Sequence, residues 1–278
     1  MYLRPRTLDE AVHILSESGG QILSGGTDFF PALGDRAVSG TVVDVSGLHE
    51  LRGIKIESQY IRIGGLTTWT QLIRTPLPSC FDGLKAAARE IGSVQIQNRG
   101  TIAGNLCNAS PAADSVPPLL TLDAEIELAS HAGTRRVPLS SFITGNRKTL
   151  RTANEVLTNV FVPRAIEKAR SSFLKLGARR YLVISIAMVA TAILRDGNNR
   201  VADARVSVGS CSAVAQRLSA LERFLSRKPA ELGLGSLVSQ AHLGDLSPID
   251  DVRGTGVYRR DAALTLVQRA IDACVGKS

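Results

Sequence analysis

Two segments of this 278-residue chain combine glycines with hydroxyl side chains in a pattern suited to binding an anion. In the first, the apolar residues Ile22 and Leu23 lead into Ser24, followed by the glycine pair Gly25-Gly26. Glycine allows positive φ and a close approach of the backbone to a ligand, and successive N–H groups in such a turn form a concave anion site. The hydroxyl of Ser24 would add a donor there, as would that of Thr27. Taken alone, the segment is more typical of an ordinary tight turn than of an anion site.

The second segment, residues 99–115, is rich in small and polar residues and lacks a regular amphipathic period. The residues alone therefore favour an irregular polar Ω-loop, and the alternative is an irregular stretch that wraps a polar ligand. The residues with the required chemistry are Gly100, Thr101, Gly104, Asn105 and Ser110. The pair Pro117-Pro118 then predicts the start of a helix whose N-terminus faces this stretch.

The two segments together resemble the paired FAD-pyrophosphate motifs of one enzyme family, and they lie about 75 residues apart in the expected order. That family comprises the FAD-binding medium subunits of the xanthine dehydrogenase and carbon monoxide dehydrogenase type. Its first motif is an A-G-G-T-D-like turn, here Ser24 to Asp28, and its second is a T-I-G-G-N-like segment, here beginning at Thr101. Ala103 stands where the family usually has the first glycine of G-G-N.

The resemblance continues through most of the chain. Matching stretches occur at Phe142 to Thr149, Glu155 to Pro163, Phe173 to Ala187, and Asp251 to Arg260. It implies a PCMH-type FAD-binding domain of two α/β subdomains (about 1–55 and 56–165) and a C-terminal α+β domain at 166–278. The C-terminal domain would contain a small antiparallel sheet, and FAD would lie extended between the domains. The implied fold class is α+β.

The resemblance also implies roles for individual residues. The FAD pyrophosphate would be held by Leu23, Ser24, Gly25, Gly26, Thr27, Asp28, Phe29, Phe30, Thr101, Ala103, Gly104 and Asn105. Asp114 would bind a ribose or adenosine hydroxyl, while Leu157 and Lys175 would lie near the flavin. A cation at Lys175 would favour the anionic reduced flavin. The alternative for Lys175 is a solvated surface lysine.

The implied function is an electron relay. A molybdopterin large subunit would hydroxylate an organic substrate, a [2Fe-2S] small subunit would carry single electrons, and this chain would pass them to an external acceptor. The assembly would be a dimer of heterotrimers. Two alternatives stay open: a stand-alone flavin oxidoreductase of related fold, and a flavin-free scaffold or nucleic-acid-binding protein suggested by the charge.

Composition argues against several other classes of protein. The net charge of +8 comes from scattered basic residues, and 4% aromatic content is low for a platform that stacks nucleic-acid bases. No apolar run approaches the roughly 20 residues of a membrane helix, and the region after Met1 does not resemble a signal peptide. A cytoplasmic location is therefore expected. The four cysteines lack metal-site spacing and are expected to be buried free thiols, so no metal site is predicted here.

The elements that must position these residues follow from periodicity and turn signals. A capping box at residues 7–10 predicts a helix that ends at Gly19-Gly20, followed by a strand at 21–23. Further strands are predicted at 41–45, 53–56, 60–63, 125–128, 135–137, 155–162, 185–194 and 200–208. Further helices are predicted at 68–74, 83–91, 214–226, 230–242 and 256–275.

Overall fold

The computed structural model describes residues 1–276 and divides them into two compact units. The first unit contains residues 1–75, 93–109 and 124–162. The second unit contains residues 76–92 and 110–123 together with the whole chain from residue 163 onward. Each unit therefore combines segments that are distant in sequence.

The first unit begins with a small parallel sheet in the order β1-β3-β2. Its elements are β1 (Tyr2–Leu3), α1 (Leu8–Ser18), β2 (Gln21–Leu23) and β3 (Val42–Asp44). Helix α1 buries Ala11, Val12 and Leu15 against Val43, as the apolar spacing predicts. Thr7 caps the helix, but the Glu10 side chain accepts from the N–H of Arg6 and not from that of Thr7.

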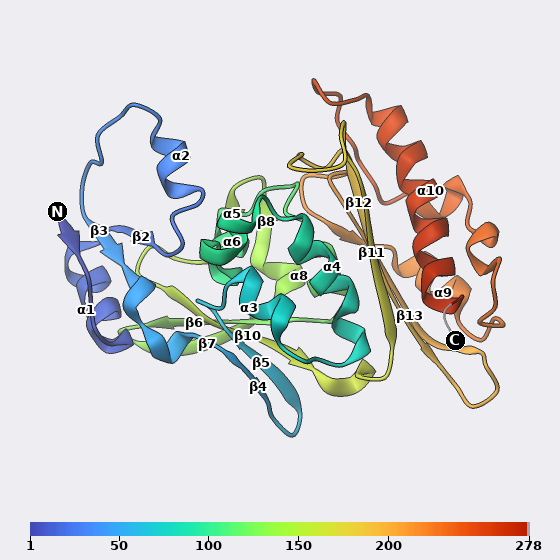
Figure 1. Cartoon of the computed structure of the whole chain (residues 1–278), viewed down its shortest axis with the longest axis horizontal. Coiled ribbons are helices and arrows are strands. Elements are labelled where there is room, and N and C mark those ends of the chain that lie inside the picture. The colour runs from blue at the N-terminus through green and yellow to red at the C-terminus, as the bar shows by residue number, and fades with distance from the viewer. Residues whose placement is uncertain (277–278) are drawn as a thin grey trace. The chain divides into compact units, whose positions relative to one another are not determined.

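A second sheet of the same unit has the strand order β4-β5-β10-β6-β7 (Figure 1). Its strands are β4 (Ile54–Ile56), β5 (Tyr60–Gly64), β6 (Glu125–Ser130), β7 (Gly133–Pro138) and β10 (Val156–Pro163). Strands β6 and β7 form the predicted antiparallel hairpin, and β6 also pairs antiparallel with β10. The predicted strands of this region are confirmed to within a few residues.

Short helices connect these strands and supply most of the candidate site. They are α2 (Phe29–Leu33), α3 (Trp69–Arg74), α5 (Val94–Arg99), α6 (Ile102–Asn108) and α8 (Leu139–Phe142). Two 3-10 turns, η1 (Val45–Gly47) and η2 (His49–Leu51), and the hairpin β8 (Ile143–Gly145) and β9 (Lys148–Thr149) complete the unit. Thr68 and Gln71 form a full capping box for α3, which begins where a helix was predicted.

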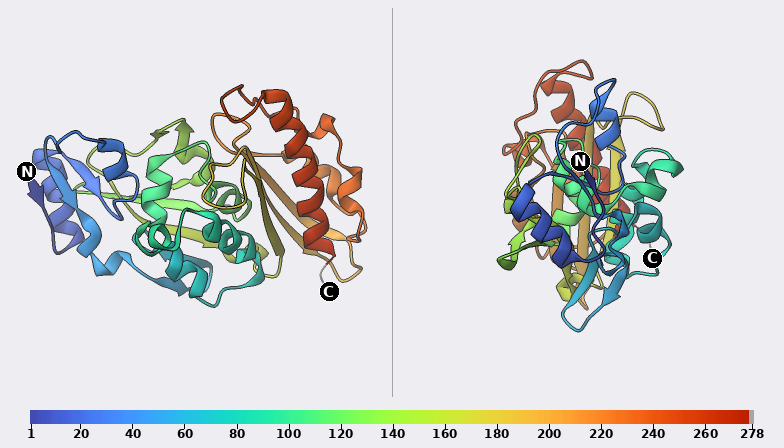
Figure 2. Two further views of the ribbon diagram at one scale, coloured as in Figure 1. Left: turned by 45° about the horizontal axis from the view of Figure 1, so that its top comes forward. Right: turned by 90° about the vertical axis from the view of Figure 1, so that its left-hand side faces the viewer.

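The second unit is built on an antiparallel sheet in the order β11-β12-β13-β14. The strands are β11 (Arg170–Leu176), β12 (Ala187–Arg195), β13 (Val201–Gly209) and β14 (Gln216–Arg217). The long helix α10 (Gly256–Val275) packs along one face, as Figure 1 and the left view of Figure 2 show. The opposite face packs against α4 (Asp82–Glu90) and α7 (Val116–Thr121).

Two sequence predictions for this unit were wrong. The predicted helix at 214–226 is shorter, because β14 occupies its start and only α9 (Ser219–Leu225) is helical. The predicted helix at 230–242 is instead two 3-10 turns, η5 (Leu234–Leu237) and η6 (Gln240–Leu243). Gly233 has φ +92°, which interrupts a regular helix, and Gly235 packs against the Gln268 carbonyl of α10 so closely that a Cβ would overlap it. Strand β11 was not predicted, and the turns η3 (Ser79–Phe81) and η4 (Arg164–Ile166) precede it.

Arginines fix α7 and the segment before it to the sheet of the second unit. Arg217 donates to the carbonyl of Leu120, at 2.9 Å, and Arg205 donates to the carbonyl of Thr121, at 3.2 Å. Both guanidinium groups also contact Asp123, at 2.7 and 2.8 Å. These contacts satisfy carbonyls at the helix C-terminus and hold residues 110–123 in place.

Within residues 1–276, no helix has the length and apolar character to span a bilayer.

Candidate functional site

The two glycine-bearing segments meet inside the first unit. Strand β2 ends at Leu23, and the Ser24 hydroxyl lies 2.8 Å from the Thr101 hydroxyl. At the next residue, a Cβ atom on Gly25 would overlap the carbonyl oxygen of Arg99. Only glycine allows the two backbones to pass at this distance. The convergence expected of the two segments is therefore observed.

The second segment is not the irregular loop expected from its composition. Arg99 ends α5, Thr101 is the N-cap of α6, and residues 102–108 are helical. Ile102 and Leu106, four residues apart, are both fully buried, so one face of α6 packs into the core. Small and polar residues surround this short apolar stripe and hid it, and the expectation of an unburied loop was wrong.

The N-terminal amides of α6 are already occupied. The N–H of Ile102 donates to the Thr67 carbonyl at 3.1 Å, and that of Ala103 donates to the Gly65 carbonyl at 3.0 Å. The N–H of Gly104 donates to the Thr101 hydroxyl at 3.1 Å. These bonds satisfy the first N–H groups of the helix, which otherwise lack partners. Ala103 lies in helical backbone, where its methyl group needs no positive φ.

A third segment, which sequence reasoning missed, supports the other two. Gly65 donates its N–H to the Thr158 carbonyl at 2.7 Å, and a Cβ on Gly65 would overlap the carbonyl of Leu157. Leu157 is buried in β10, so it lies directly behind the loop that receives the α6 amides. The sequence does contain a signal for this segment. A strand ends in the glycine pair Gly64-Gly65 and is followed by Thr67, which is the same pattern of a strand, two glycines and a threonine as in the first segment.

The free backbone donors of the site belong to residues 25–29, which we call the amide turn. Within the described part of the chain, none of its five N–H groups has a hydrogen-bond acceptor. Gly26 has φ +76°, a conformation that glycine adopts without strain. Successive unpaired amides in such a turn form a site for an anion.

An aromatic pair adjoins the amide turn. A Cβ on Gly26 would lie 2.8 Å from the Phe30 ring, and this ring packs edge-to-face against Phe29 at a centroid distance of 5.3 Å. Phe30 is nevertheless 57% exposed. The turn therefore has an apolar wall on one side that is open to solvent, next to donors that have no protein acceptor.

Asp114 and Lys175 lie together in the second unit. The Lys175 Nζ is 2.7 Å from Asp114 Oδ2 and 3.2 Å from the Val183 carbonyl, and Ser185 donates to Asp114 Oδ1 at 2.5 Å. Each side chain of the ion pair is only 8% exposed, so Lys175 is not a solvated surface lysine. Burial raises the pKa of the Asp114 carboxyl, while Lys175 and Ser185 oppose this shift.

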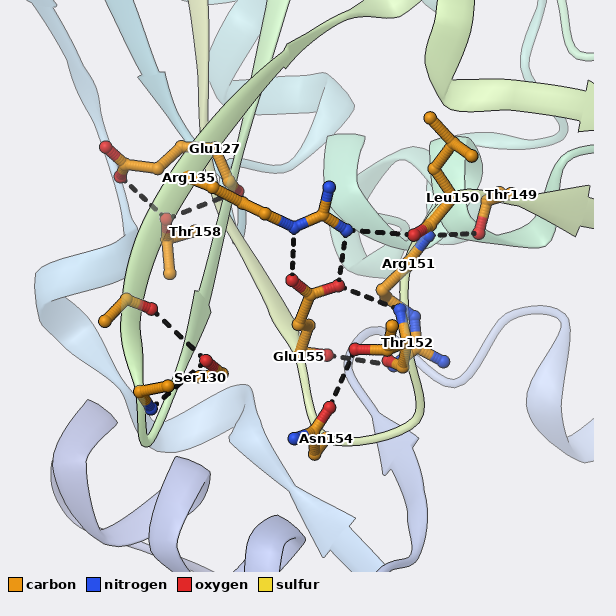
Figure 3. Close-up of polar contacts among 12 residues, drawn as sticks. Glu127, Ser130, Arg135, Thr149, Leu150, Arg151, Thr152, Asn154, Glu155 and Thr158 are labelled. Atoms are coloured by element: carbon orange, nitrogen blue, oxygen red, sulfur yellow. Dashed lines mark hydrogen bonds and ion pairs between the residues drawn. The ribbon is translucent and has the colours of Figure 1, made fainter.

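A further polar network fixes the segment before β10, the strand that carries Leu157 (Figure 3). Arg135 contacts both carboxylate oxygens of Glu155, at 2.6 and 2.9 Å, and the Thr152 N–H donates to Glu155 at 2.8 Å. The Arg135 bond, with help from Thr152, lowers the pKa of Glu155 to about 2. The network therefore holds a charged carboxylate that is only 7% exposed.

All four cysteines are free thiols, and the prediction that they are buried holds for three of them but is wrong for Cys107. Cys80, Cys211 and Cys274 are buried, and Cys107 is partly exposed. Among residues 1–276, no three His, Cys, Asp or Glu side chains are grouped so that they could hold a metal ion.

Comparison with known proteins decides the family. Residues 1–165 match the family described as FAD binding domain in molybdopterin dehydrogenase. Residues 172–274 match the CO dehydrogenase flavoprotein C-terminal domain. The chain belongs to the FAD-binding medium subunits of the molybdenum hydroxylases. The resemblance drawn from the two glycine-bearing segments is thus confirmed, and members of this family are subunits of oxidoreductases.

Individual relatives agree over nearly the whole chain. The chain is 33% identical to the xanthine dehydrogenase FAD-binding subunit of Escherichia coli O157:H7, covering 99% of this chain and 95% of that protein. It is 36% identical to the nicotinate dehydrogenase FAD-subunit of Eubacterium barkeri, covering 83% and 77%. The structure of carbon monoxide dehydrogenase from Hydrogenophaga pseudoflava matches with a TM-score of 0.90 at 28% identity, covering 99% and 96%. The expected α+β, PCMH-type fold is confirmed.

Proposed function

We propose that this chain is the FAD-binding, electron-transferring subunit of a heteromeric molybdenum hydroxylase. The observation that carries the proposal is the contact of the Ser24 hydroxyl with the Thr101 hydroxyl, directly before the five backbone N–H groups of the amide turn, which have no acceptor within residues 1–276. A diphosphate is the part of FAD that such a set of donors suits, because it offers several anionic oxygens within a short span.

The residues present fit the group that the family binds. Gly25 allows the backbone of the turn to pack against residue 99, and the amides of the turn have no acceptor within residues 1–276, whereas the first amides of the neighbouring helix α6 donate to the carbonyls of residues 65 and 67. Because the first N–H groups of α6 are used, the diphosphate contacts from this segment come from the Thr101 hydroxyl. Gly104 leaves the Thr101 hydroxyl uncrowded. A Cβ at residue 104 would lie 3.0 Å from that hydroxyl and would meet no other atom within 4 Å.

The other site residues keep the roles that the resemblance implies. Leu23 and Phe30 flank the diphosphate site, Asp114 binds a ribose or adenosine hydroxyl, and Leu157 and Lys175 lie near the flavin. When bound, FAD supplies redox chemistry in which single electrons and electron pairs can be exchanged. This chain binds and orients it, and the buried Lys175 supplies a fixed positive charge.

The organic substrate belongs to another chain in this proposal. Relatives are named as subunits of nicotinate and xanthine dehydrogenases and as the medium chain of a carbon monoxide dehydrogenase, so the substrate varies while this type of subunit is retained. We therefore propose a molybdopterin large subunit and a [2Fe-2S] small subunit as partners. Electrons would pass from the [2Fe-2S] subunit to this chain and then to an external acceptor, within a cytoplasmic dimer of heterotrimers.

The test is to purify the intact complex through a tag on this chain and to measure flavin, iron and molybdenum in the eluted material. We expect two further chains, all three cofactors, and loss of electron transfer to the acceptor when FAD is removed. Mass measurement of the complex tests the dimer of heterotrimers. Turnover of a small molecule by the isolated chain would instead support a stand-alone flavin oxidoreductase. A colourless chain that takes up no FAD, alone or with its partners, would overturn the proposal.

A further inference from the structure

Ser24 and Thr101 form what we call the hydroxyl pair, and it joins the two segments at the point where their backbones pass. The oxygens are 2.8 Å apart, and the Thr101 oxygen also accepts from the Gly104 N–H at 3.1 Å. We propose that the hydroxyl pair is a positioning device that aligns the two turns and always leaves one hydroxyl hydrogen for the diphosphate.

The two hydroxyl groups of the pair have two hydrogens between them, and the bond that joins them uses only one. A serine or threonine hydroxyl has one hydrogen and two acceptor lone pairs. If Ser24 donates to Thr101, the Thr101 oxygen has both lone pairs filled, by Ser24 and by the Gly104 N–H, and its own hydrogen is free. If Thr101 donates to Ser24, the Ser24 hydrogen is free instead. Either arrangement uses one hydrogen between the two groups and leaves one to donate outward.

The remaining hydroxyl hydrogen lies beside the proposed diphosphate site. Both oxygens adjoin the amide turn, whose N–H groups have no acceptor within residues 1–276. Ser24 is half-buried and Thr101 is buried, so neither side chain is a freely rotating surface hydroxyl. A hydroxyl that donates to an ionised phosphate oxygen forms a short, charge-assisted hydrogen bond.

This inference rests on the proposed function, and it makes a prediction that a simple list of ligands does not. In Ser24→Ala, the Thr101 hydrogen is free, and in Thr101→Val, the Ser24 hydrogen is free, so each single variant keeps a donor. Only the double variant loses it. Each single change should lower FAD affinity a few-fold through lost alignment. The double change should lower it by more than the product of the two, in total about 10- to 100-fold for a lost bond to a charged group.

The experiment is a double-mutant cycle on the dissociation constant for FAD, measured by flavin fluorescence with the purified complex after removal of its flavin. Thr101→Ser keeps the hydroxyl and should bind FAD several-fold more tightly than Thr101→Val. Ser93→Ala is the matched control, because Ser93 caps α5 through the Ile96 N–H in the same unit and takes no part in the hydroxyl pair. It should cost thermal stability without a loss of FAD affinity.

Three results would overturn the hydroxyl pair as a shared donor. They are a double variant that binds FAD within about twofold of the unchanged protein, single effects that simply multiply, and a Thr101→Ser variant as weak as Thr101→Val. Failure of the unchanged protein to bind FAD would be a different outcome, because it would remove the proposed function itself.

Discussion

The carbonyl oxygen of Arg99 occupies the place that a Cβ atom on Gly25 would need. This close passage of two backbone segments positions both the Ser24 hydroxyl and the amide turn against the N-cap of α6. The site is therefore built by packing of main chain on main chain, with few side chains involved. Its geometry should be sensitive to a single methyl group at one glycine and tolerant of the same group at another.

Gly25→Ala should separate the two segments, because the obstructing atoms belong to backbone and cannot rotate away. We expect a loss of about 1–3 kcal/mol in the free energy of unfolding, as for other overpacked sites, and at least a tenfold loss of FAD affinity. Chemical denaturation and flavin titration measure the two effects.

Gly104→Ala is the matched comparison. Its added methyl group would meet only the Thr101 hydroxyl, at 3.0 Å, and it lies inside a helix where alanine is favoured over glycine by about 1 kcal/mol. We expect near-normal stability and a smaller loss of FAD affinity than in Gly25→Ala. Equal behaviour of the two variants would contradict the close approach at Gly25.

The Arg135–Glu155 network predicts a dependence of stability on pH. The pKa of Glu155 is lowered from 4.5 to about 2 in the folded state, so the unfolded chain binds this proton more readily. The network therefore stabilises the fold above about pH 4.5, and this contribution is lost as the pH falls toward 2. Its size is on the order of 1–3 kcal/mol, reduced by the partial exposure of Arg135.

Glu155→Gln should remove this contribution at neutral pH and flatten the change in melting temperature between pH 5 and pH 3. Glu57→Gln serves as the control, because Glu57 pairs with Arg62 on the surface and is 44% exposed. A Glu155→Gln variant that is as stable as the unchanged protein at pH 7 would show that the network contributes nothing.

The sequence alone predicted which two segments converge at the site, but it did not predict which backbone N–H groups there are free to bind a ligand. The order and spacing of the two glycine-bearing segments led to the family and to their convergence, because glycine is needed where backbones pass closely. The occupation of the α6 amides could not be read, since their acceptors at Gly65 and Thr67 become neighbours only when β5 lies beside β10. Availability of a donor depends on tertiary partners that are distant in sequence.

Contacts with distant segments also explain the two elements that were predicted wrongly. Ile102 and Leu106 supply only two apolar positions, too few to show a helical period among polar residues. At 230–242 the apolar spacing looked helical, but the positive φ of Gly233 interrupts the helix, and the following 3-10 turn packs Gly235 directly on the Gln268 carbonyl of α10. In both places the deciding contact comes from another part of the chain.

The three buried cysteines should be inert toward thiol reagents in the folded protein. Burial raises the pKa of Cys80 to about 12, and the pKa values of Cys107 and Cys211 to about 11. The reactive thiolate would then be below about one part in a thousand at pH 7.5. We expect little maleimide labelling of Cys80, Cys211 and Cys274 in the native protein, slow labelling of the partly exposed Cys107, and labelling of all four cysteines in denaturant, measured by intact mass. Rapid labelling of native Cys80 would contradict its burial.

The buried Asp114–Lys175 pair should be costly to break from one side. Lys175→Met leaves the Asp114 carboxylate buried with only Ser185 as a partner, and removing one member of such a pair costs about 3–5 kcal/mol in the free energy of unfolding. The double variant Asp114→Asn with Lys175→Met should recover part of this loss, because no unpaired charge remains. Lys148→Met, at an exposed lysine of β9, is the control and should change stability little. The visible spectrum of FAD bound to the double variant then tests the flavin role separately, since a nearby positive charge affects the flavin electronically. An unchanged spectrum and reduction potential in that variant would show that Lys175 serves the fold of the second unit and not the flavin.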